Sequence, residues 1–579
     1  MTPVSDGTFT GAVANASPGD VYSYVLDGDG PYPDPASRFQ PHGVHGPSAV
    51  VDPGAFAWSD QGWRGVPIED AVFYELHIGT FTAAGTFASA IEQLPYLADL
   101  GITVVELMPI ADFPGSRNWG YDGVSLFAPS RAYGTPDDLR RLVDTAHRLG
   151  LGVVLDVVYN HFGPDGAYGS LFSSFYVSAR HRSPWGAAVN LDGEGADQVR
   201  EFFIENALHW LHEYHVDGLR LDATHGLIDN SPRHFVAELA ARARASLPDR
   251  QLLLIAEDER NLRTIVQPVT EDGWGLDAVW ADDFHHQVRR LAAGDRDGYY
   301  ADYAGTIADL ATTLRDGWFY RGQFSAHQGT SRGTDPSGIP AHRMVICLQN
   351  HDQIGNRPFG RRLNHQIEPA LFRALSALLL FAPETPLLFM GQEWAASTPF
   401  LFFTDHYAEL GRLVTEGRRN EFSRFDAFAD PETRARIPDP QAPATFEDSK
   451  LAWDERTRPP HAGVLELYRA LLRLRRSEAP LRRGDRFEAV ALDETSLAMV
   501  RRGDRETWIL VLCTGSARHV SLGAWRSAAP NRHWQAVLST DEPRFQESGN
   551  PDKSVLTIDR NDNLALRFAR PASVILKGV

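Results

Sequence analysis

The stretch GLRLDATH, residues 218–225, decides the fold class, because its apolar run ends abruptly on a carboxylate. A second stretch, LLIAEDE at residues 253–259, repeats this arrangement further along the chain. A parallel barrel presents the carboxyl ends of its strands, and the acids that follow them, at one face. The two stretches therefore predict neighbouring parallel strands that carry Asp222 and Glu257 to a common face.

Eight short apolar runs, bounded by turn or polar residues, have the character of buried parallel strands. Amphipathic segments separate several of them. The clearest covers residues 135–149, with Thr135 as its expected N-cap and Gly150 just past its end, and a second covers 197–214. Strand and helix alternate eight times, which predicts an α/β fold with a (β/α)8 TIM barrel. The expected strands are Val72–Gly79, Thr103–Met108, Gly152–Val158, Gly218–Asp222, Leu252–Glu257, Ala278–Asp282, Met344–Gln349 and Pro386–Met390.

Two flanking regions break this alternation and set the expected domain boundaries. Residues 1–60 are rich in Gly, Pro and Asp, and we expect a small, partial N-terminal β-sandwich that the chain enters partway. Residues 61–480 should hold the barrel, with inserted loops after its third and sixth strands and a closing helix over 461–476. Residues 481–579 alternate short polar and apolar runs, which predicts a C-terminal β-sandwich. Its strands are expected near 507–512, 554–558, 564–568 and 573–576.

The composition of the chain limits the kinds of molecule that it is expected to bind. The 579 residues carry a formal net charge of −19, so nucleic-acid backbones and anionic membranes would repel the chain, whereas a neutral polyhydroxylated ligand is compatible. The two cysteines, Cys347 and Cys513, lie far apart in apolar runs, which predicts buried free thiols. The first residues lack the pattern of a secretory leader, and no apolar run is long enough to span a bilayer. We therefore expect a cytoplasmic protein, and no feature identifies a protein partner.

The acids at the strand ends match the chemistry of glycoside hydrolysis, in which one carboxylate attacks and one carboxyl group protonates the leaving oxygen. Asp222 is the candidate nucleophile, because Arg220, two residues earlier on the same strand face, favours its ionised form. Glu257 is the candidate acid, since the apolar residues before it disfavour ionisation. Asp352, after the seventh strand, is a third candidate acid. His161, after the third strand, is placed to bond a sugar hydroxyl.

Simpler interpretations compete with these assignments. An acid after a strand is more often an N-cap than a catalyst, and 75 acidic residues make chance placements common. His161 and His351 could each simply bond backbone carbonyls. Polar clusters after four different strands outweigh these interpretations, because a barrel gathers them at one face. The pair His285 and His286 suggests a metal, but we place both on one strand, where neighbours point to opposite faces. We reject a metal site and expect no organic cofactor.

Four segments resemble the signature regions of the α-amylase superfamily of retaining glycosidases: DVVYNH (156–161), GLRLDATH (218–225), LLIAEDE (253–259) and LQNHDQ (348–353). The resemblance implies that Asp222 is the nucleophile, Glu257 the acid and base, and Asp352 the stabiliser of the transition state. It also implies substrate contacts from Tyr121, Asn160, His161, Arg220, Leu221, Ala223, Thr224, His225, His351, Gln353, Ile354, Gly355 and Asn356.

Longer segments, among them WADDFHHQVR (280–289) and LQNHDQIGNRPFG (348–360), resemble one family of this superfamily, the malto-oligosyltrehalose trehalohydrolases. That resemblance implies a hydrolase of trehalose biosynthesis with maltooligosyltrehalose as its substrate. The enzyme would cleave the α-1,4 bond that joins a maltooligosaccharide to the terminal trehalose. By analogy, the subsites for trehalose would be shaped by Asp282, Asp283, Phe284, His285, Gln353 and Asn356.

Two alternatives remain open on the sequence. A 1,4-α-glucan branching enzyme or an α-amylase would share the three acids, so the acids do not discriminate between these activities. A catalytically silent barrel that only binds carbohydrate would typically lack one or more of the acids, and all three are present. Product analysis on maltooligosyltrehalose separates the activities, since only the trehalohydrolase would yield mainly free trehalose.

Overall fold

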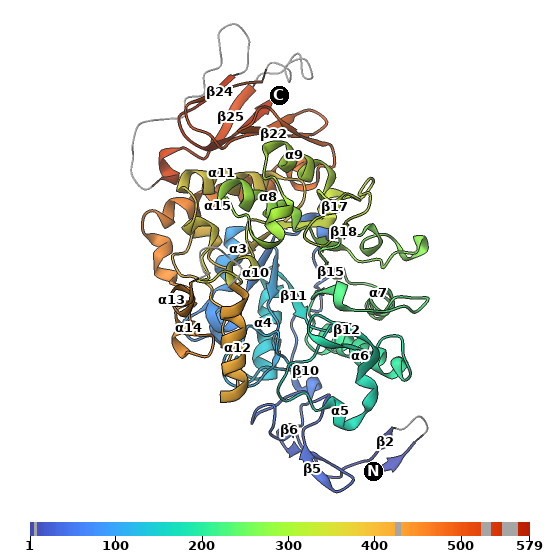
Figure 1. Ribbon diagram of the computed structural model, residues 1–579. Coiled ribbons are helices and arrows are strands. Elements are labelled where there is room, and N and C mark those ends of the chain that lie inside the picture. Colours follow the sequence, from blue (N-terminus) through green and yellow to red (C-terminus); the bar gives the residue numbers. More distant parts are fainter. Residues whose placement is uncertain (5–7, 423–429, 523–533, 547–564, 579) are drawn as a thin grey trace.

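The computed structural model describes residues 1–4, 8–422, 430–522, 534–546 and 565–578. The molecule is elongated, with short N-terminal strands at one end, the barrel in the middle and a group of C-terminal strands at the other end (Figure 1). This arrangement places a β/α unit between two flanking β regions.

The middle of the chain forms a closed barrel of eight parallel strands, which confirms the predicted fold class. Each strand overlaps one of the predicted runs, and the last strand pairs back to the first. In order around the barrel, the strands are β7 (Phe73–Leu76), β8 (Val104–Leu107), β11 (Gly152–Val157), β14 (Gly218–Leu221), β15 (Leu253–Glu257), β16 (Ala278–Trp280), β19 (Met344–Cys347) and β20 (Thr385–Phe389).

The register of three central strands explains why their polar side chains meet. Leu221 of β14 lies beside Val157 of β11 on one side and beside Ala256 of β15 on the other. The next residues, Asp222 and Glu257, therefore leave the sheet at the same level and at the same end of the barrel. This is the geometry that the two stretches of sequence predicted.

Helices surround the barrel, and the three predicted ones are confirmed. Helix α4 (Pro136–Arg148) begins at a capping box, in which Thr135 and Asp138 each accept a hydrogen bond from the other's backbone amide. Helix α6 covers Ala196–Glu213 and α15 covers His461–Ser477. The remaining long helices include α3 (Leu94–Leu100), α7 (Phe235–Ser246), α8 (Asp283–Ala292), α9 (Ile307–Asp316), α11 (Pro369–Phe381) and α12 (Ala408–Glu421).

Two insertions follow the carboxyl ends of their strands, as the long gaps in the strand pattern predicted. The first, between β11 and β14, contains α5 (Gly169–Phe172) and the hairpin of β12 (Val177–Ser183) and β13 (Gly186–Val189). The second, between β16 and β19, contains α8, α9 and the hairpin of β17 (Phe324–Ser325) and β18 (Thr330–Ser331). Both insertions are positioned to shape the end of the barrel where Asp222 and Glu257 lie.

The flanking regions are rich in strands. The N-terminal region contains three two-stranded sheets: β1 (Thr2–Pro3) with β2 (Phe9–Thr10), β3 (Val21–Tyr22) with β6 (Ser48–Ala49), and β4 (Tyr24–Leu26) with β5 (Asp29–Tyr32). The C-terminal region contains a five-stranded antiparallel sheet, in the order β21 (Phe487–Ala491), β22 (Ser496–Arg502), β23 (Thr507–Cys513), β27 (Ala572–Gly578) and β25 (Trp534–Ser539). A separate pair joins β24 (Arg518–Ser521) and β26 (Ala565–Phe568). The strand expected at 554–558 lies outside the described residues, and the division at residues 60 and 480 stays a proposal.

The two cysteines have the buried positions that the sequence predicted. Cys347 and Cys513 are buried free thiols. Within the ranges that the structure describes, no helix combines the length and the apolar character needed to cross a bilayer.

Candidate active site

Asp222 directly follows β14, and both of its carboxylate oxygens have protein partners. Arg220 Nη1 lies 2.6 Å from Oδ1, and Asn160 Nδ2 donates to Oδ2 at 2.7 Å. The fully buried Arg220 also reaches both oxygens of Asp156 at 2.9 Å, and its guanidinium carbon lies 4.3 Å from the centre of the Trp280 ring. These contacts fix the Asp222 carboxylate next to a buried positive charge, which suits an ionised nucleophile.

Glu257 ends β15 in a different environment. The backbone amide of Ala223 donates to its Oε2 at 2.6 Å, whereas Arg220 Nη2 lies 3.8 Å from the same oxygen. Burial raises the pKa of Glu257 well above its ordinary value against the opposing effect of Arg220, and Asp222 adds to the rise. A carboxyl group that keeps its proton near neutral pH is what a general acid requires.

Asp352 is the second residue of α10 (His351–Gly355), the short helix after β19. Its side chain is 45% exposed, against 12% for Asp222 and 17% for Glu257, so it is the most open of the three acids. His351 Nε2 lies 3.4 Å from its Oδ1. Although burial opposes the shift, His351 holds the pKa of Asp352 below its ordinary value. Asp352 is therefore an open, ionised carboxylate.

A continuous chain of polar contacts joins Asp222 to Asp352, and Glu257 lies 3.8 Å from Arg220, a member of this chain. Arg220 contacts both Asp222 and Asp156, and Asp156 Oδ2 accepts a hydrogen bond from the Tyr121 hydroxyl at 2.7 Å. The same hydroxyl lies 2.8 Å from Nε2 of His351, the neighbour of the third acid, and the two rings are stacked at 5.1 Å. The acids thus converge at one end of the barrel.

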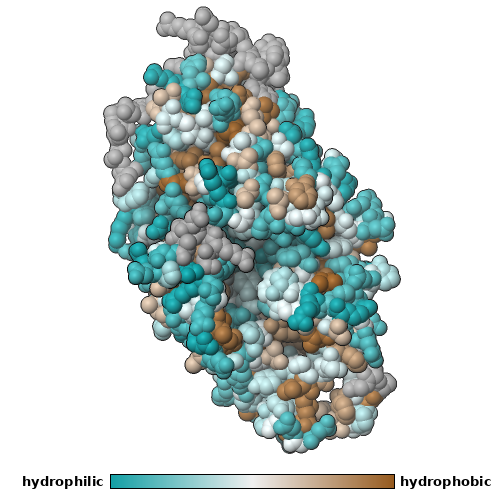
Figure 2. Space-filling model, in the orientation of Figure 1, coloured by the Kyte–Doolittle hydropathy of each residue, from teal (hydrophilic) through white to brown (hydrophobic). Residues whose placement is uncertain are grey.

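The surface next to Asp352 is hollowed. A cavity of about 300 Å³ is lined by Asp352, Gln353 and Asn356 together with Tyr299 and Tyr300 of the second insertion. The face shown in Figure 2 is hollowed near its middle, and many of the residues around the hollow are hydrophilic. A cavity of this size and polarity can accept sugar rings.

The predicted substrate-binding residues fall into two groups. Tyr121, His161, His225 and Asp282 are half-buried, Asn356 is exposed, and Gln353 lines the cavity, so a ligand can reach this group. The second group is buried, and Leu221, Phe284 and Ile354 belong to the hydrophobic core, so they support the site from behind. This second group comprises Asn160, Arg220, Leu221, Ala223, Thr224, Asp283, Phe284, His285, His351, Ile354 and Gly355.

His161 makes the kind of backbone contact that the simpler interpretation of the sequence allowed. Its Nδ1 contacts Asn160 Oδ1, and its Nε2 donates to the backbone oxygen of Tyr121 at 3.1 Å. Both nitrogens therefore already have protein partners. The proposal that His161 contacts the sugar rests on its position between these two site residues.

His285 and His286 lie on helix α8 and not on a strand, which corrects the expectation from the sequence. Strand β16 ends at Trp280, and Asp283 begins the helix. The Asp283 carboxylate accepts hydrogen bonds from the Tyr303 hydroxyl at 2.5 Å and from two backbone amides of the second insertion at 2.6 and 3.0 Å. It anchors this insertion and is closed to a ligand. Among the described residues, no group of three or more His, Cys, Asp or Glu is arranged to hold a metal ion.

Trp185 is a residue at the site that the sequence did not single out. It lies in the turn of the β12–β13 hairpin, and 46% of it is exposed. Its ring is parallel to that of His161 at 5.3 Å and lies 6.1 Å from that of His225. An exposed aromatic ring in this position suits stacking on a sugar face. The available signal was weak, because SPWG (183–186) reads as an ordinary turn in a chain with 13 tryptophans.

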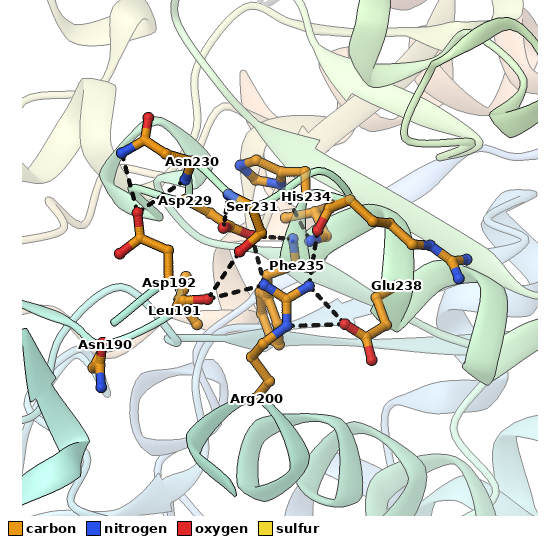
Figure 3. Close-up of polar contacts among 12 residues, drawn as sticks. Asn190, Leu191, Asp192, Arg200, Asp229, Asn230, Ser231, His234, Phe235 and Glu238 are labelled. Atoms are coloured by element: carbon orange, nitrogen blue, oxygen red, sulfur yellow. Dashed lines mark hydrogen bonds and ion pairs between the residues drawn. The ribbon is translucent and has the colours of Figure 1, made fainter. Parts of the chain in front are cut away.

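Arg200 of α6 ties the first insertion to the loop that follows the nucleophile (Figure 3). It donates to the backbone oxygen of Leu191 at 3.0 Å, to Asp229 at 2.7 Å and to Glu238 at 2.6 and 2.9 Å. Asp229 also accepts from the backbone amide of Phe235, the first residue of α7, at 2.6 Å. The insertion, the loop and α7 are thereby held as one unit.

Known proteins share sequence with most of this chain. The family model of the alpha amylase catalytic domain matches residues 51–175. The malto-oligosyltrehalose trehalohydrolase of Deinococcus radiodurans is 50% identical over 466 residues, which cover 80% of this chain and 75% of that protein. The protein of the same name from Saccharolobus solfataricus is 42% identical over 471 residues, which cover 81% of this chain and 80% of that protein.

Two further proteins with other names also resemble this chain. A 1,4-alpha-glucan branching enzyme, GlgB of Corynebacterium jeikeium, is 31% identical over 589 residues, which cover 94% of this chain and 72% of that protein. A solved Salmonella typhimurium protein named as an alpha amylase has a TM-score of 0.88 and 39% identity, and the match covers 100% of this chain and 94% of that one. The higher identities to the trehalohydrolases decide between the two enzyme families. The chain belongs to the malto-oligosyltrehalose trehalohydrolase family of the α-amylase superfamily.

Proposed function

We propose that this enzyme hydrolyses the α-1,4 bond next to the terminal trehalose of maltooligosyltrehalose and releases free trehalose and a maltooligosaccharide. The names of the relatives at 42–50% identity support the substrate. The observation that carries the chemistry is the polar network around Arg220, in which Asp222 is paired with this cation at 2.6 Å, whereas Glu257 lies 3.8 Å from it and has a raised pKa.

The two acids have complementary roles in this proposal. Asp222 attacks the anomeric carbon while Glu257 protonates the departing 4-oxygen of trehalose. Glu257 then takes a proton from water, and that water releases the maltooligosaccharide from Asp222 with its α configuration retained. Asp352 offers negative charge to the oxocarbenium-like transition state from the open side of the site. The scheme uses side chains of this protein alone.

The test combines two variants with product analysis. Asp222→Ala and Glu257→Gln should each lower kcat on maltotriosyltrehalose by at least about a hundredfold, since general acid catalysis alone contributes that much. Glu201→Gln, a change of a half-exposed acid on α6, is the control and should keep full activity. Chromatography of the wild-type products should show mainly trehalose and maltotriose. Near-normal turnover in either site variant would refute the roles, and branched or random α-glucan products would refute the specificity.

A further inference from the structure

Glu75, a buried acid in the first barrel strand, holds His351 at two points. Its Oε1 lies 2.5 Å from Nδ1 of the imidazole, and its Oε2 accepts a hydrogen bond from the backbone amide of His351 at 3.1 Å. Both side chains are at most 2% exposed. One carboxylate thus fixes both the ring and the backbone of the residue that precedes Asp352.

The hydrogen-bond partners of His351 define its protonation state. Nδ1 faces a carboxylate, which accepts a hydrogen bond and cannot donate one when ionised. Nε2 faces the Tyr121 hydroxyl, whose single proton goes to Asp156. The hydroxyl oxygen can therefore only accept from Nε2. Both ring nitrogens carry hydrogens, so His351 is an imidazolium.

We propose that Glu75 is a positioning residue of this active site: it keeps His351 doubly protonated, with its positive charge and Nε2–H fixed beside Tyr121 and Asp352, so that this cation holds the Asp352 carboxylate in place. The inference rests on the proposed function, since it assigns Glu75 to the site which that function requires. Glu75, His351 and Asp352 then form a row of alternating charge that leads from the barrel interior to the sugar-binding side. Glu75 acts only through His351 and does not touch the substrate.

The surroundings of His351 show why Glu75 matters for its charge. Burial by itself would lower the pKa of His351, whereas the carboxylates of Glu75 and Asp352 raise it well above its ordinary value. Without the charge of Glu75, burial would return the pKa of His351 toward or below the neutral range. The other charged and titratable groups that face this pair come from several elements, and they are His77, Glu106, Tyr121, Asp156, Arg220 and Cys347.

Glu106 offers a matched control. It is the register partner of Glu75 on the neighbouring strand β8 and is equally buried, at 1% exposure. In contrast to Glu75, neither of its carboxyl oxygens has a hydrogen-bond partner among the described residues. Burial raises the pKa of Glu106 well above its ordinary value, and the charge of Glu75 adds to the rise. Glu106 is therefore a neutral acid, and its change to glutamine removes no charge.

The experiment compares Glu75→Gln and Glu106→Gln with the wild type by kcat/KM between about pH 5 and about pH 8. In E75Q, His351 loses its charged partner and deprotonates within this range. The ratio of E75Q to wild-type kcat/KM should therefore fall about tenfold for each pH unit above the new pKa of His351, and it should recover as the pH is lowered. E106Q should follow the wild-type profile. Melting temperatures of all three proteins show whether each variant is folded at the assay temperature.

Each outcome bears on the proposal. If kcat/KM of E75Q is lowered by the same factor at every pH, or is not lowered at all, the proposal is overturned. A contact that is merely structural would lower kcat/KM without any dependence on pH. If E75Q does not fold, Glu75→Asp replaces it in the experiment. This variant keeps the negative charge, so its loss of kcat/KM relative to wild type must be the same across the pH range. A loss of kcat/KM that changes with pH would overturn the proposal. The two proposals fail separately. Absence of trehalose among the wild-type products refutes the proposed function, whereas the ratio of E75Q to wild type can be measured on any α-glucan that the wild type cleaves.

Discussion

Replacing Arg200 by methionine should loosen the contact between the first insertion and the loop after Asp222. The Arg200 side chain is 9% exposed. Methionine fills much of the same volume but supplies no charge and no hydrogen-bond donor. Asp229, whose side chain is fully buried, would be left without its cation. The five hydrogen bonds of Arg200 that would be lost go to Leu191, Asp229, Arg233 and Glu238.

The expected loss of free energy in the Arg200→Met variant can be derived from the burial of the charged partners. Removal of one partner of a buried ion pair costs about 3–5 kcal/mol, mainly because the other charge stays buried and uncompensated. Glu238 is 30% exposed and can be solvated after the change, so Asp229 accounts for most of the loss. We therefore expect the low end of the range, about 3 kcal/mol, which corresponds to about a hundredfold in the local opening equilibrium.

Hydrogen exchange measures this local opening. Amides in 186–200 and 227–238 should exchange about a hundredfold faster in Arg200→Met than in the wild type. Arg242→Met is the matched control: Arg242 pairs with Glu201 and Glu205 across the same two helices, but its side chain is 37% exposed, so we expect less than about 1 kcal/mol. The double variant R200M/D229N should recover part of the protection, because it removes the orphaned charge. Equal exchange in R200M and R242M would refute the reasoning.

Three further changes test other contacts. His147 bridges Asp60 and Asp217 at 2.8 and 2.9 Å. Although burial opposes the shift, these two carboxylates raise the pKa of His147. The contribution of His147 to stability is therefore fully present below about pH 6.5 and is lost as pH rises through the raised pKa. The difference in melting temperature between wild type and His147→Gln should therefore shrink on going from about pH 6 to about pH 9, and a constant difference would contradict this. Arg220→Lys should lower kcat at least about tenfold, because one ammonium group cannot hold Asp156 and Asp222 together; unchanged kcat would argue against the network. Trp185→Ala should raise KM for maltooligosyltrehalose about threefold to tenfold and leave kcat nearly unchanged, whereas an unaltered KM would exclude stacking.

The barrel could be predicted from the sequence because local pattern and tertiary role agree in its strands. Each strand is a short, mostly apolar run of buried residues, and such runs are typical of the strands of a parallel sheet. The N-cap of α4 could be predicted equally well, because Thr135 and Asp138 accept hydrogen bonds from each other's backbone amides and need no contact from the rest of the fold. The acids at the strand ends followed from the barrel, since its geometry fixes where the strand ends meet.

The rest of the site depends on contacts that no local pattern encodes. Glu75 and Glu106 interrupt apolar strands, and only the closed barrel shows that both are buried and that one of them contacts a histidine of the helix after the seventh strand. His285 was misplaced because β16 stops at Trp280, and the polar residues that follow already begin a helix. The role of Asp283 could not be predicted from the sequence either, because its hydrogen-bond partners belong to an insertion whose path the sequence does not reveal.

Asp222 and Asp352 have the same arrangement of charged partners behind them, which accounts for their proposed division of roles with Glu257. Asp222 is backed by Arg220, which is backed by the buried Asp156; Asp352 is backed by His351, which is backed by the buried Glu75. The Tyr121 hydroxyl joins the two rows, because it contacts both Asp156 and His351. In each row a cation lies between two acids, so the cation is not left uncompensated in the barrel. Glu257 belongs to neither row: Arg220 is 3.8 Å away, and its hydrogen bond comes from a neutral amide. Burial therefore prevails over the attraction of Arg220 at Glu257, and this carboxyl group is the one that we assign to protonation of the leaving sugar.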